Sequence, residues 1–182
     1  MRYLSIALLF VSTAVPSIAQ KFGAAENLAP YIPTPQLIVE RMLEVGRVKA
    51  GDVVYDLGSG DGRIVITAAQ KFGARGVGVE INPDLCRKAL QQIKALGLAD
   101  RVSMIEDSAL RVDLSPANVV TMYLLTNSNE RLKPHLEKYL KPGSRIVSNE
   151  FPIPGWKPVE MLEIKTGSVN HRIYVYEIGH TR

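Results

Sequence analysis

Short apolar segments alternate with amphipathic ones along most of the chain. Residues 53–57 are nearly all apolar, with Asp56 close to the end of the run. Such a run is typical of a strand that is covered on both faces, as in parallel sheets. Residues 63–72 follow with Ile64, Ala68 and Ala69 at helical spacing, which predicts a helix packed by one face. Because this alternation repeats, the pattern predicts an α/β fold.

The same pattern predicts the extent of each element. Strands are expected at residues 53–57, 76–80, 102–106, 118–125 and 144–149, and helices at residues 35–45, 63–72, 83–96 and 130–140. Two further strands, at residues 159–165 and 172–178, have no helix between them and are expected to form a hairpin. Strands that alternate with helices pair in parallel through right-handed crossovers. We therefore expect a Rossmann-like, doubly wound seven-strand sheet, mostly parallel, with a C-terminal antiparallel hairpin.

The first residues have the features of a secretory signal. Met1 and Arg2 are followed by thirteen mostly apolar residues at 3–15 and by small residues at Ser17 and Ala19. This order predicts cleavage after Ala19 and an exported or periplasmic protein. The alternative is an uncleaved anchor that associates the protein with a membrane. The domain organisation expected is a signal or anchor at residues 1–19, an extended proline-rich lead-in at 20–35 and one catalytic domain at 36–182.

Composition narrows the class of protein. Charged residues make up 22% of the chain, and the net charge is +4 with neutral histidines. Lys and Arg are scattered without a long run, so we expect no nucleic-acid partner. His135, His171 and His180 lack the spacing of metal ligands, so no metal is predicted. Nothing in the chain predicts a second domain, and a monomer is expected.

The strongest candidate site is the glycine-rich turn from Asp56 to Gly62, which lies between a predicted strand and a predicted helix. In such sheets, ligands bind at the carboxyl ends of the strands, against the N-terminus of the following helix. The turn has the pattern G-x-G-x-G, not the G-x-G-x-x-G of dinucleotide sites. Asp56 and Asp61 would repel a pyrophosphate, and they suit a ligand with ammonium and sulfonium groups. The turn therefore predicts S-adenosylmethionine as the cofactor.

Two further carboxylates end the next two strands. Glu80 ends the second strand, where an acidic residue can accept both ribose hydroxyls. Asp107 follows the third, where a carboxylate can accept a hydrogen bond from an adenine amino group. Three carboxylates at successive strand ends predict one cofactor site.

Several stretches carry a resemblance to a known family. They are residues 30–35, 54–63, 76–83, 119–125, 140–143 and 156–158. From Tyr31 to Pro158 the chain resembles class I S-adenosylmethionine-dependent methyltransferases, in particular the lysine methyltransferases of the ATP synthase c-subunit and their bacterial counterparts. Two departures affect the substrate side of the pattern: Asn149-Glu150 stand where bacterial relatives have His-Asp, and Thr126 stands where proline is common.

The resemblance implies a role for each matching residue. Those expected at the cofactor are Asp56, Gly58, Ser59 and Gly60 at the methionine end, Glu80 at the ribose, Asp107 at the adenine, and Tyr31 and Thr34 on the covering lead-in. Tyr123, Asn149 and Glu150 are the catalytic candidates, and Phe151 would help to wall the acceptor channel. Arg63 is expected to pair with Asp61 or Glu80.

The acceptor stays open at this level. A protein lysine is the first expectation. A small molecule or quinone is the alternative, and a non-enzymatic cofactor-binding module is a third reading. Since S-adenosylmethionine is made in the cytoplasm, an export signal requires an anchored domain with its site inside, a mis-assigned start, or an exported protein with a changed role.

Overall fold

The computed structural model describes residues 26–181, and the predicted signal at residues 1–19 lies outside that range. The helices are α1 (Gln36–Val45), α2 (Arg63–Phe72), α3 (Pro83–Ala95) and α4 (Thr126–Tyr139). The strands are β1 (Val53–Leu57), β2 (Arg75–Glu80), β3 (Val102–Glu106), β4 (Val119–Met122), β5 (Arg145–Asn149), β6 (Glu160–Thr166) and β7 (Val169–Glu177). None of the helices within the described residues is long and apolar enough to cross a bilayer.

The strands form one sheet of seven in the order β3-β2-β1-β4-β5-β7-β6. The first five are parallel, whereas β7 pairs antiparallel with both β5 and β6. The predicted fold class is therefore confirmed. Because the order turns from β1 toward β2 on one side and toward β4 on the other, the switch point lies beside β1, where this architecture places its ligands.

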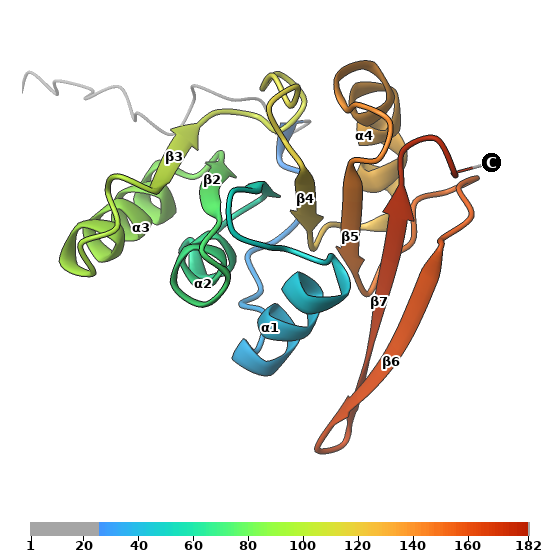
Figure 1. The fold of residues 1–182 in the computed structure, drawn as a ribbon, viewed down its shortest axis with the longest axis horizontal. Helices are drawn as coiled ribbons and strands as arrows, with labels where there is room; N and C mark the ends of the chain where they lie inside the picture. The colour runs from blue at the N-terminus through green and yellow to red at the C-terminus, as the bar shows by residue number, and fades with distance from the viewer. Residues whose placement is uncertain (1–25, 182) are drawn as a thin grey trace, which may run out of the picture.

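Helices cover both faces of the sheet (Figure 1). On one face, α1 and α2 pack on β-strand residues such as Val54, Val119 and Val147, and α3 joins α2 in a smaller cluster. On the other face, α4 packs through Leu132 and Leu136 on the opposite side chains of the same strands. Burial on both faces explains why the parallel strands are continuous apolar runs.

The main difference from the predicted elements lies after β4. The predicted strand at 118–125 ends at Met122, and α4 begins at Thr126 instead of residue 130. No side chain caps α4. Its first turn is held instead by Asn129, whose Nδ2 donates to the carbonyl oxygens of Phe151 at 2.9 Å and Pro152 at 3.2 Å. These long-range bonds convert a polar stretch, which resembles a loop, into a helix.

The hairpin of β6 and β7 extends beyond the carboxyl end of β5 (Figure 1). Asn149, the last residue of β5, pairs with Ile173, while β7 already begins at Val169. Residues 169–172 of β7 and their partners on β6 therefore extend past the edge of the sheet where the parallel strands end. The hairpin thus extends the sheet past the edge where the parallel strands end.

Candidate cofactor and acceptor site

A cleft opens at the carboxyl ends of β1, β2 and β4, with about 770 Å³ of space between its lining atoms, part of it open to solvent. Its floor is the glycine turn after β1, and its cover is the lead-in at residues 26–34. All eight residues predicted at the cofactor line this cleft, namely Tyr31, Thr34, Asp56, Gly58, Ser59, Gly60, Glu80 and Asp107. Tyr123 also lines it, whereas Asn149 and Glu150 do not.

The turn is shaped by close approach of the backbone to its neighbours. Gly60 has a φ of +58°, and a Cβ atom there would meet the Tyr31 ring at 2.5 Å. Glycine is therefore required both for the conformation and for the contact with the lead-in. The N–H groups of Gly58 and Ser59 both donate to the Val79 carbonyl oxygen at 2.9 Å, which ties the turn to β2.

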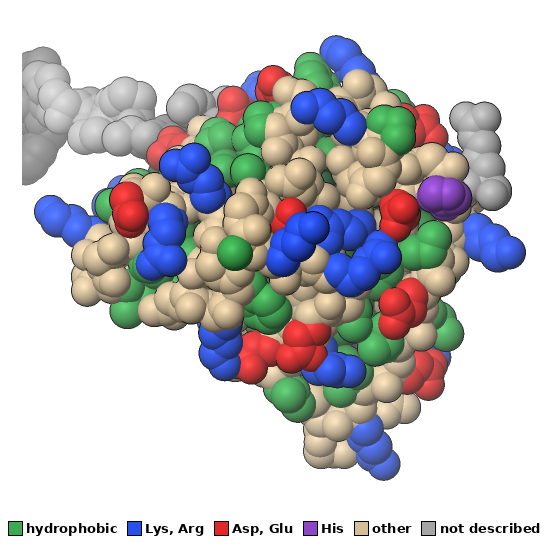
Figure 2. Space-filling view, in the orientation of Figure 1, with side chains coloured by type: hydrophobic (Ala, Val, Ile, Leu, Met, Phe, Trp, Pro, Cys, Tyr) green, Lys and Arg blue, Asp and Glu red, His purple; other side chains and the backbone are tan. Residues whose placement is uncertain are grey.

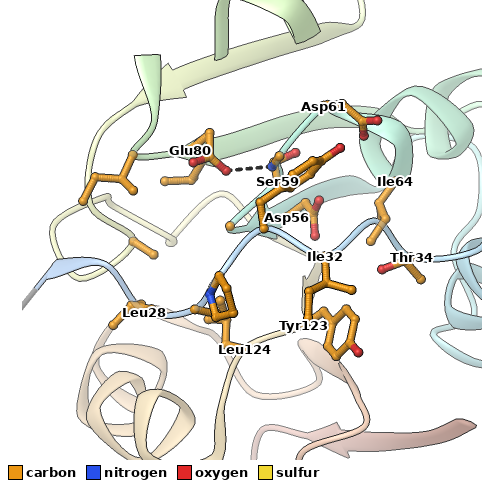
Figure 3. Close-up of a pocket in the computed structure, with 18 of the residues that line it drawn as sticks. Leu28, Ile32, Thr34, Asp56, Ser59, Asp61, Ile64, Glu80, Tyr123 and Leu124 are labelled. Atoms are coloured by element: carbon orange, nitrogen blue, oxygen red, sulfur yellow. Dashed lines mark hydrogen bonds between the residues drawn. The ribbon is translucent and has the colours of Figure 1, made fainter. Parts of the chain in front are cut away.

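Glu80 holds the other side of this turn. The side chain is 6% exposed. Its Oε2 accepts a bond from the Gly60 N–H at 2.7 Å (Figure 3), and its Oε1 accepts one from the Asn82 N–H at 2.8 Å. Each carboxylate oxygen can accept a further bond, so Glu80 can shape the turn and still receive ribose hydroxyls.

Asp56 is the buried carboxyl of the site. It is 3% exposed, and the Thr121 hydroxyl donates to its Oδ1 at 2.7 Å. Burial raises the pKa of Asp56 to about 7, although the bond from Thr121 acts in the opposite direction. A carboxyl that is costly to ionise in a dry site is stabilised by a cationic ligand. The ammonium group at the methionine end of the cofactor fits this position.

Asp61 forms one of the two pairs expected for Arg63. Arg63 pairs with it through two bonds, Nε to Oδ1 at 2.9 Å and Nη2 to Oδ2 at 2.6 Å. Partial burial opposes ionisation of Asp61, but the bonds from Arg63 outweigh it and hold its pKa below the usual value. Asp56, Asp61 and Glu80 all line the cleft, and together they disfavour a pyrophosphate, although Arg63 offsets the charge of Asp61.

The lead-in is anchored at three points, so that it covers the cleft. Arg63 Nη1 donates to the Thr34 carbonyl oxygen at 2.8 Å, and the Ser128 hydroxyl donates to that of Leu28. Arg111 pairs with Glu26 at 3.0 Å and with Asp107 at 2.8 Å. Asp107, which is predicted to bind the adenine, therefore also helps to hold the lead-in through Arg111.

The predicted acceptor residues lie along the same edge of the sheet. Tyr123 follows β4 and stacks on Phe151, with ring centroids 6.2 Å apart and 24° between the planes. In Figure 3 the Tyr123 hydroxyl points away from the glycine turn. Asn149 ends β5 and is fully buried, and neither atom of its amide has a hydrogen-bond partner among the described residues. Glu150 pairs with His171.

Sequence reasoning missed two contributors to this site. Thr121 orients Asp56, and the one sequence feature that could have indicated this role is its hydroxyl group in an otherwise apolar strand. His171, which contacts Glu150, was considered only as a metal ligand. Within residues 26–181, no cluster of three or more His, Cys, Asp or Glu side chains could hold a metal ion.

Replacing Asp56 by Asn is expected to stabilise the cofactor-free protein and to abolish cofactor binding. The folded-state pKa of about 7 lies above the ordinary 3.8. The native fold therefore binds the Asp56 proton more tightly, and stability falls as pH rises from about 4 to about 7. The Asn variant avoids this cost, which is at most about 4 kcal/mol. Its Tm should exceed that of the wild type at pH 8 and differ less at pH 5.

Calorimetry with S-adenosylhomocysteine provides the binding half of that test. Wild-type affinity should rise from pH 6 to pH 8, because the ligand ammonium prefers ionised Asp56. Asp113→Asn, an exposed carboxyl outside the cleft, should leave affinity unchanged. A flat profile, with tight binding by Asp56→Asn, would exclude this role for Asp56.

Replacing Glu80 by Ala is expected to weaken cofactor binding by about 1–3 kcal/mol, since it strands buried hydrogen-bonding groups of the turn and the ligand. Glu80→Gln keeps one acceptor oxygen and should show a smaller loss. Calorimetry gives the affinities, and circular dichroism checks that both variants fold. Unchanged affinity in a folded Ala variant would remove Glu80 from the ribose position.

Comparison with known proteins agrees with this geometry. A model of the ANTKMT methyltransferase domain matches residues 56–160. The chain is 54% identical over 151 residues to a protein-lysine N-methyltransferase from Saccharolobus islandicus, across 82% of this chain and 94% of that protein. It is 32% identical over 149 residues to an adenine nucleotide translocase lysine N-methyltransferase from Mus musculus, across 82% of this chain and 63% of that protein.

A solved structure gives the same result. The crystal structure of an RNA methyltransferase from Salinibacter ruber, in complex with S-adenosyl-L-homocysteine, superposes with a TM-score of 0.76 at 45% identity. The match covers 81% of this chain and 94% of that one. Since the family model matches more than half of the sequence and the archaeal relative exceeds half identity, the chain belongs to the ANTKMT methyltransferase domain family and is an S-adenosylmethionine-dependent methyltransferase.

Proposed function

We propose that this enzyme methylates the side-chain amine of a lysine in a protein. The observation that carries the proposal is the 54% identity to an archaeal protein-lysine N-methyltransferase over nearly the whole of that relative. A mouse relative named for lysine methylation supports the same proposal at 32% identity, although the chain spans slightly less than two thirds of that protein.

S-adenosylmethionine supplies a methyl group on a sulfonium, and the chain's own residues have to present a neutral amine in line with it. Positioning of two reactants accounts for most of the rate in such a displacement. Tyr123 and Phe151 form an aromatic wall beside the cleft. An apolar wall lowers the pKa of a lysine amine, because it disfavours the charged form.

The polar groups around that wall suit an amine. Burial, followed by the nearby charge of Glu150, raises the pKa of Tyr123, so its hydroxyl stays protonated at neutral pH. The Asn149 amide is buried without a partner among the described residues, and a buried amide that makes no hydrogen bond is costly. We assign Tyr123 and Asn149 to orienting the acceptor, and Glu150 to taking its proton.

An RNA acceptor is the second candidate, because the Salinibacter ruber relative is described as an RNA methyltransferase. On the face shown in Figure 2, Lys and Arg side chains lie among acidic and apolar ones and do not form one continuous basic field. RNA binding depends largely on such basic surface. This favours the protein acceptor, and the experiment below distinguishes the two.

Incubation with labelled cofactor and with protein and RNA fractions of the source cell should label protein, on lysine. Tyr123→Ala should lower kcat at least tenfold and change cofactor affinity little, because the lost contact positions the acceptor and not the donor. Tyr139→Ala, an aromatic outside the cleft, serves as the matched control. Label confined to RNA or to small molecules would overturn the lysine proposal.

We also propose that residues 1–19 direct export, with a membrane anchor as the alternative. The support is the order of charge, apolar run and small residues, which lies outside the described structure. Mass spectrometry of protein from the source cell should find a chain that begins at Gln20. An intact Met1 in the membrane fraction would contradict cleavage and support the anchor.

A further inference from the structure

The turn after β5 holds a non-glycine residue in the left-handed region. Glu150 has a φ of +63°, which costs about 1–2 kcal/mol for an L-residue. Two backbone bonds maintain it, from Glu150 N–H to the Arg172 carbonyl oxygen at 2.7 Å and from Phe151 N–H to that of Asn149 at 2.8 Å. Backbone strain of this kind clusters at active sites, ligand clamps and switch regions.

The direction of the Glu150 side chain is toward β7. Its Oε1 lies 2.6 Å from His171 Nδ1, and His171 Nε2 lies 2.8 Å from the Thr166 hydroxyl on β6. His171 is 8% exposed. Carboxylate, imidazole and hydroxyl thus form a continuous row, in which both ring nitrogens are engaged. This row lies on the overhanging part of the hairpin, beside the edge where the cofactor cleft opens.

The row also reaches the aromatic wall of the cleft. Phe151, the residue after Glu150, stacks on the ring of Tyr123, and Tyr123 lines the cleft. The charge of Glu150 adds to the effect of burial in raising the pKa of Tyr123. Arg172 meets Glu150 through its backbone, with its N–H 3.4 Å from Oε2, whereas its guanidinium bonds Glu163. Among the described residues, the titratable side chains that act on or are acted on by Glu150 include His171 from β7 and Tyr123 from the end of β4.

We propose that His171 is a positioning residue for the methyl transfer: it orients Glu150 and relays onward the proton that Glu150 removes from the acceptor amine. The inference rests on the proposed lysine acceptor. The ammonium gives one proton to the Glu150 carboxylate and becomes the neutral amine. The carboxylic acid returns to carboxylate by giving that proton to Nδ1 of neutral His171, and the imidazolium so formed releases its Nε2 proton, past Thr166, to solvent. Glu150 ends as it began, whereas His171 ends with its proton on Nδ1 and regains its first tautomer by proton exchange with solvent before the next turnover.

The test uses two substitutions of His171 in the full chain. His171→Gln keeps hydrogen-bonding atoms but cannot titrate near neutrality. It should lower kcat for a lysine peptide about tenfold or more, and leave the peptide KM and the affinity for S-adenosylhomocysteine within about twofold. His171→Ala should show a similar loss that added imidazole partly restores. His135→Ala, whose ring bonds the Val112 carbonyl oxygen on the far side of α4, should show no imidazole-dependent gain.

The pH profile and an NMR spectrum of the His171 ring complete the test. The wild-type kcat should rise through neutral pH, and the inflection should move in His171→Gln. The ring nitrogen signals of His171 should shift in Glu150→Gln, because that substitution removes the carboxylate that faces Nδ1. Wild-type kcat and an unchanged pH profile in folded His171→Gln would overturn the relay, as would unchanged ring signals in Glu150→Gln. Absence of lysine methylation by the wild type would instead overturn the proposed function, and the ring signals would still report on the pair.

Discussion

The bond from the Gly60 N–H to Glu80 joins the two halves of the cofactor site. It connects the turn after β1 with the end of β2, and the bonds from Gly58 and Ser59 to the Val79 carbonyl oxygen run parallel to it. In the turn held by these bonds, the Tyr31 ring packs directly on Gly60, and a Cβ atom at that position would collide with the ring. The contact of Tyr31 with the turn therefore depends on a carboxylate one strand away, and the anchors from Arg63, Ser128 and Arg111 hold the rest of the lead-in over the cleft.

Burial of Asp56 in the same region lowers the stability of the folded protein. Asp56 lies in the centre of the sheet with the Thr121 hydroxyl as its partner, and a buried carboxyl with one neutral donor is not fully compensated. Apolar packing of Val54, Val119 and Val147 against α1 surrounds it and holds the strands in place. The apolar core supplies the stability that keeps Asp56 away from water. The buried carboxylate is stabilised in turn only when a cationic ligand binds beside it.

The sequence predicts the parts of the molecule that depend on near neighbours. The strand at 53–57, the glycine turn and the carboxylates at successive strand ends follow from apolar runs and spacing, and the structure places Asp56, Glu80 and Asp107 around one cleft. The end of β4 is predicted wrongly. Tyr123 and Leu124 are apolar because they line the cleft, and the sequence does not distinguish this from apolar residues of a buried strand. The start of α4 depends on Asn129 and a loop more than twenty residues later, which no local pattern reveals.

The donor and acceptor sides of the site are built by different means, and this explains why they differ in predictability. Donor-side groups sit at the ends of parallel strands, so topology alone brings them together. On the acceptor side, Glu150 and His171 are 21 residues apart, and their contact needs a left-handed turn and an antiparallel hairpin that overhangs the edge of the sheet. The overhanging end of the hairpin can change its length without disturbing the parallel strands, because β7 pairs with β5 only from Ile173 to Glu177. The proposed acceptor side can therefore vary while the cofactor cleft stays fixed, and the similar proteins are named for different acceptors, protein lysine for two of them and RNA for a third.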